Sequence, residues 1–288
     1  MKKYISIVCC FLVACLCLQC HKEGTNNYPS LEGPEGTTGN LFSISSNRKV
    51  YFSKGNLQYQ ASTNTWRFAE NQWDVIGESN VNISSTYSGW IDLFVYGTSG
   101  YDSVFPYLTE LPSEKTYVAA MDISGTNYDW GTYNPISNGG NQVGLWRMLN
   151  KDEMIFLLSR CDLNGNLLSG KGTLTFKDGN SIDGIIIMPD NYIGEHNTSF
   201  NWGEISVDEL NNWGGVFISP LSGNLRTRQG EVHYDEMDYI HVSSDYPFEN
   251  PEYPRRNEYF KVGFGAFWHP NFASNLGAAV RLVRDYEK

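Results

Sequence analysis

Cysteine is nearly absent from the body of this chain. Five of the six cysteines lie within the first 20 residues, which leaves Cys161 alone in the remainder. A single cysteine cannot build a disulfide framework, so we expect the apolar core to hold the fold together. Because Cys161 follows an apolar run, we expect it to be a small buried hydrophobe.

Basic residues are also few. Lys and Arg number 21 against 32 Asp and Glu, which gives a formal net charge of -11. Proteins that bind nucleic acids rely on clustered Lys and Arg to neutralise phosphates. The composition therefore argues against a nucleic-acid partner, and solubility is the simpler explanation of the acidic excess.

The leader MKKYISIVCCFLVACLCLQC has two lysines and then an uncharged apolar run that is short for a membrane span. Residues 1–20 are therefore expected to be a secretory signal. Leu12-Val13-Ala14-Cys15 resembles a bacterial lipobox, in which a small residue precedes a cysteine that becomes lipidated. Cys20 is the rival, because the polar sequence starts directly after it, as in many lipoproteins of gut Bacteroidales. We expect lipid on Cys15 or Cys20, and an ordinary cleaved signal is the alternative.

Residues 21–39 contain much Gly, Pro, Thr and Asn and almost no large apolar side chain. Such a segment cannot bury enough surface to offset its conformational entropy, so we expect a flexible stalk. The length from 40 to 288 suits one large domain with a sizeable core. Residues 41–77 alternate apolar and polar side chains in short runs and predict three or four antiparallel strands. Residues 259–268 and 278–285 also have strand composition.

The clearest elements lie between Gly144 and Asp190. Asn150 and Glu153 match a capping box, which predicts a helix beginning at Asn150. Met154, Leu157 and Leu158 share one helical face, and the apolar residues at 155 and 156 predict burial on most sides. Two apolar runs then flank Asp178-Gly179, a dipeptide typical of tight hairpins. A second capping box, Ser206 with Glu209, predicts a short helix that ends at Gly214, followed by a strand.

Before these elements, residues 80–111 and 122–142 are rich in aromatic side chains but show no periodicity. Ordered loops of that length are often functional. Exposed rings bind the apolar faces of sugars or act as hot spots for protein partners. Most rings in a chain of this composition belong to a core. The candidate ligand-binding residues are Trp90, Tyr101, Tyr128, Trp130 and Trp268.

Several blocks, taken in their order, carry a family resemblance: VYFSKGNLQYQ, WRFAENQWDVIG, GWIDLFVYGTSG, GLWRMLNKDE, GIIIMPDN, GGVFISPLSG and AAVRLVRD. The chain resembles the major paralogous domain family first described in Fibrobacter, related to the formylglycine-generating-enzyme branch of the C-type-lectin-like fold. The resemblance implies an α+β, C-type-lectin-like domain with two main helices around a twisted antiparallel core and long irregular loops. Asp102-Ser103-Val104 also resembles the O-glycosylation acceptor of exported Bacteroidales proteins, with Ser103 as the acceptor.

The same resemblance argues against two activities. Formylglycine-generating enzymes use a late pair of cysteines, and the late segment GFGAFWHPNFASNLGAAVRLVRD has none, so oxidase chemistry is not expected. The tripeptides by which calcium-dependent lectins hold calcium and sugar are absent as well. We expect no cofactor. A hypervariable late segment, as in receptors of diversity-generating retroelements, is a minor alternative.

Two polar clusters have the residue types of metal ligands. Asp162, Asn164 and Asn166 alternate like a calcium loop, but the glycine falls one place early and no glutamate closes it, so a plain turn is expected. A second cluster lies in a Tyr-rich segment and fits no established metal motif. Its residues are His233, Asp235, Asp238 and His241.

The function expected from these features is an envelope-exposed, lipid-anchored module that binds or displays glycan or protein ligands and performs no catalysis. Its location would be the outer membrane, facing the cell surface. Its ligand surface would use the loops between Ser85 and Gly140 and the segment from Gly263 to Leu276. One alternative is a glycan-acting enzyme with paired carboxylates, such as Asp208 with Glu209 or Glu249 with Glu252. The other is a structural component of a surface assembly.

Overall fold

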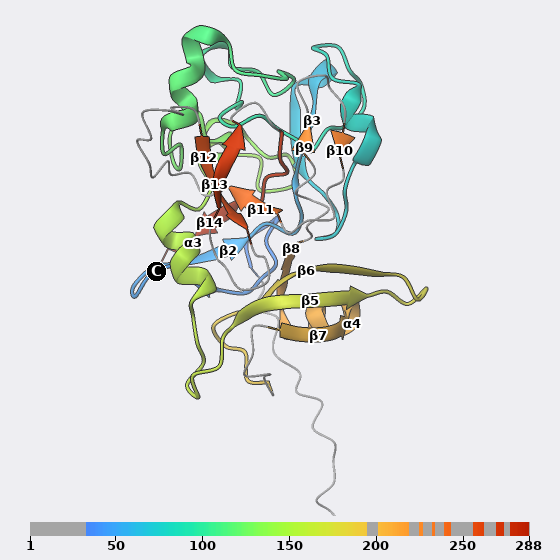
Figure 1. Ribbon diagram of the computed structural model, residues 1–288, viewed down its shortest axis with the longest axis vertical. Coiled ribbons are helices and arrows are strands. Elements are labelled where there is room, and N and C mark those ends of the chain that lie inside the picture. The colour runs from blue at the N-terminus through green and yellow to red at the C-terminus, as the bar shows by residue number, and fades with distance from the viewer. Residues whose placement is uncertain are drawn as a thin grey trace, which may run out of the picture.

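The computed structural model describes residues 33–194, 201–218 and 277–287, together with five strand backbones at 225–226, 232–233, 239–242, 256–261 and 269–273. Sheets dominate these ranges, with a few short helices packed beside them (Figure 1). The chain is therefore a mixed α+β protein, as expected. Among the described residues, no helix is long and apolar enough to cross a bilayer.

The largest sheet has the strand order β7-β5-β6-β8. Strands β5 (Ser169–Thr175) and β6 (Ser181–Ile187) form the expected hairpin. Its turn is stabilised by Asp178, which accepts from the Asn180 amide at 3.0 Å, and by Gly179 at a φ of 87°. Strand β7 (Asn201–Ser206) adds parallel to β5, and β8 (Val216–Ile218) adds antiparallel to β6.

Helix α3 (Lys151–Leu158) begins with the predicted capping box: Asn150 Oδ1 accepts from the Glu153 amide, and the Glu153 carboxylate accepts from the Asn150 amide. Its buried face packs against β5 and against β1 (Phe42–Ser43). The expectation that the helix is buried on most sides is wrong. Ile155 is 45% exposed and Phe156 is 37% exposed, because only one side of the helix is covered.

Helix α4 (Val207–Trp213) confirms the second capping box, with Ser206 and Glu209 exchanging hydrogen bonds. Gly214 ends the helix in the left-handed conformation, at a φ of 68°. A β-carbon there would lie only 1.9 Å from Asn40 Nδ2, so glycine is required for space as well as for conformation. The helix packs beside β7, and β8 follows it directly.

Short antiparallel strands open the domain, as predicted. Strand β2 (Lys49–Phe52) lies between β1 and β14 (Val283–Asp285), so the start and the end of the domain share one sheet. Strands β3 (Leu57–Gln60) and β4 (Thr65–Phe68) form a hairpin. The predicted strand at 278–285 is confirmed only in its last residues.

The remaining strands form two small antiparallel sheets. One pairs β9 (Leu225–Arg226) with β10 (Val232–His233). The other has the order β11-β12-β13, with β11 (Tyr239–Val242), β12 (Arg256–Lys261) and β13 (His269–Ala273).

The expected stalk ends earlier than predicted. Thr37 pairs with Ser53 across an isolated antiparallel bridge, and the Thr38 amide donates to the Phe52 carbonyl at 2.9 Å. Gly36 also accepts a hydrogen bond from the Lys54 amide at 2.8 Å. Residues 36–38 therefore belong to the domain. The part of the stalk before Gly33 lies outside the described residues.

The aromatic loops are ordered because they form much of the largest core cluster. Rings from these loops pack with β3 and β4, for example Phe94 against Trp66 at a centroid distance of 5.5 Å. Five short helices lie in or beside these loops: η1 (Ala61–Thr63), η2 (Gly77–Val81), η3 (Tyr101–Ser103), η4 (Ser113–Ala120) and α2 (Trp130–Tyr133). Helix η4 lies at the opposite end of the molecule from the β5–β6 hairpin (Figure 1).

Candidate functional site

Four tyrosines, from η3, η4, α2 and the turn before α2, meet at one surface. Tyr101 contacts Tyr128 edge to face, with ring centroids 5.1 Å apart, and contacts Tyr133 in the same way at 5.4 Å. Tyr117 reaches Tyr128 from η4 at 6.4 Å. Tyr117 is 48% exposed and Tyr133 is 40% exposed, so two rings present a large area to solvent. We call these four residues the tyrosine surface.

A polar network runs along this surface. Asp102 accepts a hydrogen bond from Tyr128 Oη at 3.1 Å and pairs with the Lys115 ammonium. The hydroxyls of Tyr117 and Tyr128 are 2.8 Å apart. The hydrogen bond from Lys115 holds the pKa of Asp102 below its ordinary value, and burial raises the pKa of Tyr128. At neutral pH the surface therefore combines apolar ring faces with neutral hydroxyls and one ion pair.

The backbone beneath this network is unusual. Asp102 and Ser103 are successive non-glycine residues with φ values of 51° and 64°. Such left-handed conformations cost roughly 1–3 kcal/mol each and concentrate at binding and catalytic sites. The turn gives Asp102 its position between Lys115 and Tyr128. Ser103, the expected O-glycosylation acceptor, is exposed on the same turn.

Of the predicted ligand residues, Tyr101 and Tyr128 belong to the tyrosine surface, although Tyr128 is only 7% exposed and offers little beyond its hydroxyl. Trp130 is 1% exposed and donates from its indole nitrogen to the Thr98 carbonyl at 3.0 Å. The expectation that its ring faces a ligand is therefore wrong. Trp130 is a core residue, because α2 turns it toward Phe94.

Trp90 is half-buried and lies under the Arg67 guanidinium, whose carbon is 3.8 Å from the ring centroid. Arg67 is held in turn by a 2.8 Å hydrogen bond to Gln58. This face of Trp90 is therefore already occupied by a cation. Trp268 lies outside the described residues, as do Cys15 and Cys20.

Cys161 is exposed, so the expectation that it is a buried hydrophobe is wrong. Helix α3 ends at Leu158, before Cys161, and buries only its own inner face.

The expected turn at 162–166 is confirmed, because Asp162 Oδ1 accepts from the amides of Asn164 and Asn166, each at 2.8 Å. The described residues contain no group of three or more His, Cys, Asp or Glu that could hold a metal. Two predicted sets fall outside the described side chains: the histidine cluster at 233–241 and the pair Glu249 and Glu252.

The other acid pair has structural roles. Glu209 caps α4, and Asp208 pairs with Lys177 at 3.1 Å.

Two further carboxyls, Asp92 and Asp129, are fully buried, and burial raises the pKa of each to about 6. Both accept hydrogen bonds from backbone amides and hold loops together. A raised pKa is therefore a product of burial here and does not identify a reacting group.

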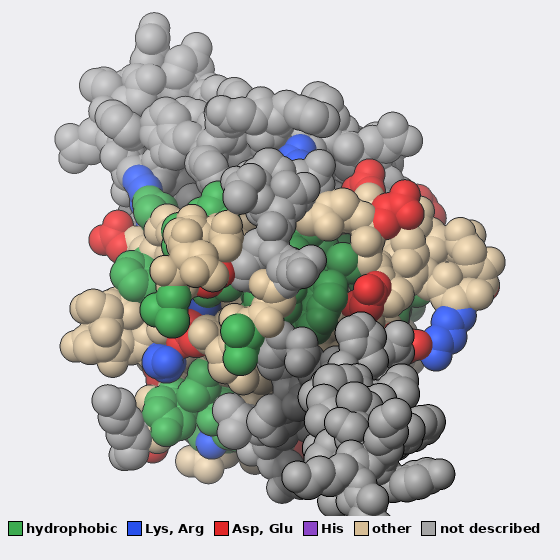
Figure 2. All heavy atoms as spheres, turned by 90° about the horizontal axis from the view of Figure 1, so that it is seen from below, with side chains coloured by type: hydrophobic (Ala, Val, Ile, Leu, Met, Phe, Trp, Pro, Cys, Tyr) green, Lys and Arg blue, Asp and Glu red, His purple; other side chains and the backbone are tan. Residues whose placement is uncertain are grey.

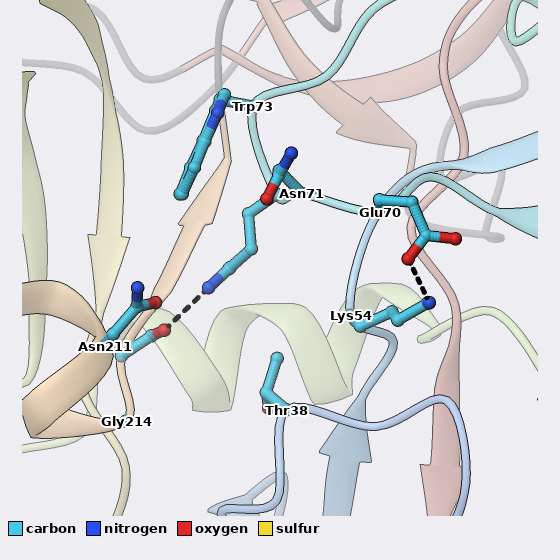
Figure 3. Close-up of a pocket in the computed structure, with 9 residues that line it drawn as sticks. Thr38, Lys54, Glu70, Asn71, Trp73, Asn211 and Gly214 are labelled. Carbon is cyan, nitrogen blue, oxygen red and sulfur yellow. Dashed lines mark hydrogen bonds and ion pairs between the residues drawn. The ribbon is translucent and has the colours of Figure 1, made fainter. Parts of the chain in front are cut away.

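A separate pocket of about 200 Å³ lies between α4 and the segment after β4. Figure 3 shows Trp73 and Asn71 on one side, Asn211 and Gly214 on another, and the Lys54–Glu70 ion pair at the far edge. Thr38 closes the pocket from the N-terminal segment. We call this site the tryptophan pocket, and sequence reasoning missed it because its walls are distant in the chain.

The floor of the tryptophan pocket is Gln72. Its side chain donates to the Gly215 carbonyl at 3.1 Å and accepts from Phe217 and from Arg281 at 2.8 and 2.9 Å. Arg281 is fully buried, and burial lowers the pKa of its guanidinium to about 9. No described carboxylate forms a salt bridge with Arg281. The floor is therefore rigid and lies above a buried cation.

Figure 2 shows Lys and Arg side chains as separate spots among acidic and apolar groups on the described part of one face. Comparison with protein-family models, with curated proteins and with solved structures found no match for this chain.

Proposed function

We propose that this protein is a lipid-anchored, envelope-exposed module of C-type-lectin-like fold that binds glycan or protein ligands through the tyrosine surface. Its location would be the outer membrane, and no catalytic step is needed. The observation that carries the proposal is the meeting of four tyrosines, three of them from separate short helices, with Tyr128 bonded to the Asp102 carboxylate.

Tyrosine suits this role because one end of its ring is apolar and the other donates and accepts hydrogen bonds. It also loses little conformational entropy on binding, since only two torsions must be fixed. The consecutive left-handed residues Asp102 and Ser103 support the proposal, because strained turns of this kind persist where the surrounding structure holds a functional geometry. The late segment from Gly263 to Leu276 stays part of the proposed surface.

The lipid anchor and the location rest on the leader. A short apolar run after two lysines, with Cys15 and Cys20 near its end, supports export and lipidation. Glycan hydrolysis by Asp208 and Glu209 receives no support, because Glu209 caps a helix and Asp208 pairs with a lysine.

The test of ligand binding is a glycan array and a surface pull-down with the full chain, comparing wild type with Tyr133→Ala and Tyr117→Ala. Both side chains are more than a third exposed, so capture is expected to fall while the melting transition stays in place. Tyr286→Ala is the matched control, since Tyr286 is 39% exposed elsewhere on the molecule. Equal capture by all variants would rule out the tyrosine surface.

Lipidation has its own test. Labelling with a fatty-acid analogue is expected to mark the wild-type chain and to be lost in either Cys15→Ala or Cys20→Ala, which identifies the modified residue. An unlabelled wild-type chain in its native host would refute the anchor and leave the binding surface unaffected.

A further inference from the structure

We infer that the tryptophan pocket is a second binding site, which takes one uncharged, polyhydroxylated ring the size of a hexose. It shares no residue with the tyrosine surface, so the inference does not depend on the proposed function. The size of the pocket, its charge and its preformed walls support this inference.

The volume limits the ligand to a small one. Pockets that hold drug-sized ligands measure roughly 300–1,000 Å³. The tryptophan pocket, at about 200 Å³, is large enough for one sugar ring or a group of similar size. Its walls combine the indole of Trp73 with the side-chain amides of Asn71 and Asn211 (Figure 3). Aromatic rings contact the C–H face of a sugar, and amides pair with hydroxyls because they both donate and accept.

The charges around the pocket disfavour an ionic ligand. Lys54 Nζ and Glu70 Oε2 are 2.7 Å apart, so the ion pair at the edge is already neutral. An anion would meet the Glu70 carboxylate, which is largely exposed at the edge. A cation would meet Lys54 and, below the Gln72 floor, the buried guanidinium of Arg281. An uncharged ligand avoids both repulsions.

The pocket is also preformed. Gly214 and Gly215 line it where the chain leaves α4, and Gln72 bonds the backbone on the opposite side. The Trp73 ring is held by an edge-to-face contact with Phe176 at 5.6 Å. The walls therefore need little rearrangement to accept a ligand, which lowers the entropic cost of binding.

The experiment uses the full chain in detergent and saturation-transfer NMR with four probes: glucose, galactose, mannose and N-acetylglucosamine. At least one is expected to bind saturably. Asn211→Ala is expected to weaken that binding about threefold to tenfold, as the loss of one hydrogen bond predicts. Asn212→Ala is the matched control, because Asn212 is the next exposed residue of α4 and does not line the pocket.

Asn211→Ala also separates binding from folding. Asn211 is exposed on α4, so the melting temperature of the variant is expected to stay near that of wild type while affinity falls. Tyr133→Ala is expected to leave hexose binding unchanged, which distinguishes this site from the tyrosine surface. The inference is overturned if no hexose binds, if Asn212→Ala weakens binding as much as Asn211→Ala, or if Asn211→Ala leaves affinity unchanged. Stronger binding of acetate, choline or adenosine than of every hexose would also overturn it.

Discussion

Tyr128 Oη lies 3.1 Å from Asp102 Oδ2 and only 2.8 Å from the hydroxyl of Tyr117. A tyrosine hydroxyl has one proton, and the carboxylate can only accept, so Tyr128 donates to Asp102. Tyr117 must then donate to Tyr128. The protons along the tyrosine surface thus point in one direction, toward the carboxylate that Lys115 also neutralises.

This order predicts how the Asp102 pKa responds to substitution. The hydrogen bond from Lys115 lowers the pKa more than the one from Tyr128 does, so Lys115→Met is expected to raise it more than Tyr128→Phe. The pKa of Asp102 is lower in the folded protein than in the unfolded chain. The ion pair with Lys115 therefore stabilises the fold fully at pH values above the unfolded-state pKa, and this stabilisation is lost as pH falls through the folded-state pKa. An NMR titration of the Asp102 carboxyl measures both shifts. A larger shift in Tyr128→Phe would contradict the order of the two donors.

A second prediction concerns Trp130, which sequence reasoning placed on a ligand surface. Its ring is buried and hydrogen-bonded to Thr98, so Trp130→Ala is expected to cost about 3–5 kcal/mol of unfolding free energy. Tyr133→Ala, on the same short helix, is expected to cost less than about 1 kcal/mol because its ring is largely in solvent. Urea denaturation of the two variants makes the comparison. Similar costs would mean that Tyr133 belongs to the core.

The contrast between Trp130 and Tyr133 shows where the sequence was informative. Both lie in an aperiodic aromatic loop, and side-chain type alone does not tell which ring turns inward. The capping boxes at Asn150 and Ser206 were predictable because they are local: the donor and the acceptor lie three residues apart. The hairpin turn at Asp178 was predictable for the same reason.

The candidate sites could not be derived in this way. The tyrosine surface needs rings from η3, η4, α2 and the turn before α2. The tryptophan pocket joins Thr38 to Asn211 across most of the chain. Such contacts depend on tertiary packing, which leaves no periodic signal in the sequence. The prediction that Ile155 and Phe156 are buried was wrong for a related reason. The apolar character of a residue does not indicate whether another part of the chain packs over it.

A third prediction compares the two helix-capping glutamates. Glu153 is buried and accepts from both Arg48 and Arg147 in addition to the backbone amide of Asn150. Glu209 is exposed, and its carboxylate accepts hydrogen bonds from the amide and the hydroxyl of Ser206. Glu153→Gln is therefore expected to cost about 2 kcal/mol or more, because it weakens charged hydrogen bonds in a buried place. Glu209→Gln is expected to cost less than about 0.5 kcal/mol.

Chemical denaturation at neutral pH measures both costs. Asp285→Asn offers an internal check, because Asp285 shares Arg147 through hydrogen bonds of 2.8 Å to Nε and Nη2. Since Glu153 and Asp285 bond the same guanidinium, the double variant is expected to be non-additive. Strict additivity would show that Arg147 does not couple α3 to β14.

The last prediction follows from the buried carboxyl of Asp92. Burial raises its pKa from 3.8 to about 6, against the opposing hydrogen bonds from Ile76 and Asn80. Between these two values the unfolded chain is ionised while the folded protein keeps its proton, so folding stability falls as pH rises from about 4 to about 6. The size of the loss is on the order of 3 kcal/mol, since each pKa unit corresponds to 1.36 kcal/mol.

Asp92→Asn removes this titration while keeping the shape of the side chain. Urea denaturation between pH 4 and pH 7 is therefore expected to show the largest advantage of wild type over the variant near pH 4 and a smaller one above about pH 6. Asp129, whose pKa is raised in the same way, is present in both proteins and cancels from the difference. A difference that stays constant across this range would mean that Asp92 is ionised in the folded protein throughout, held so by the Ile76 amide and Asn80.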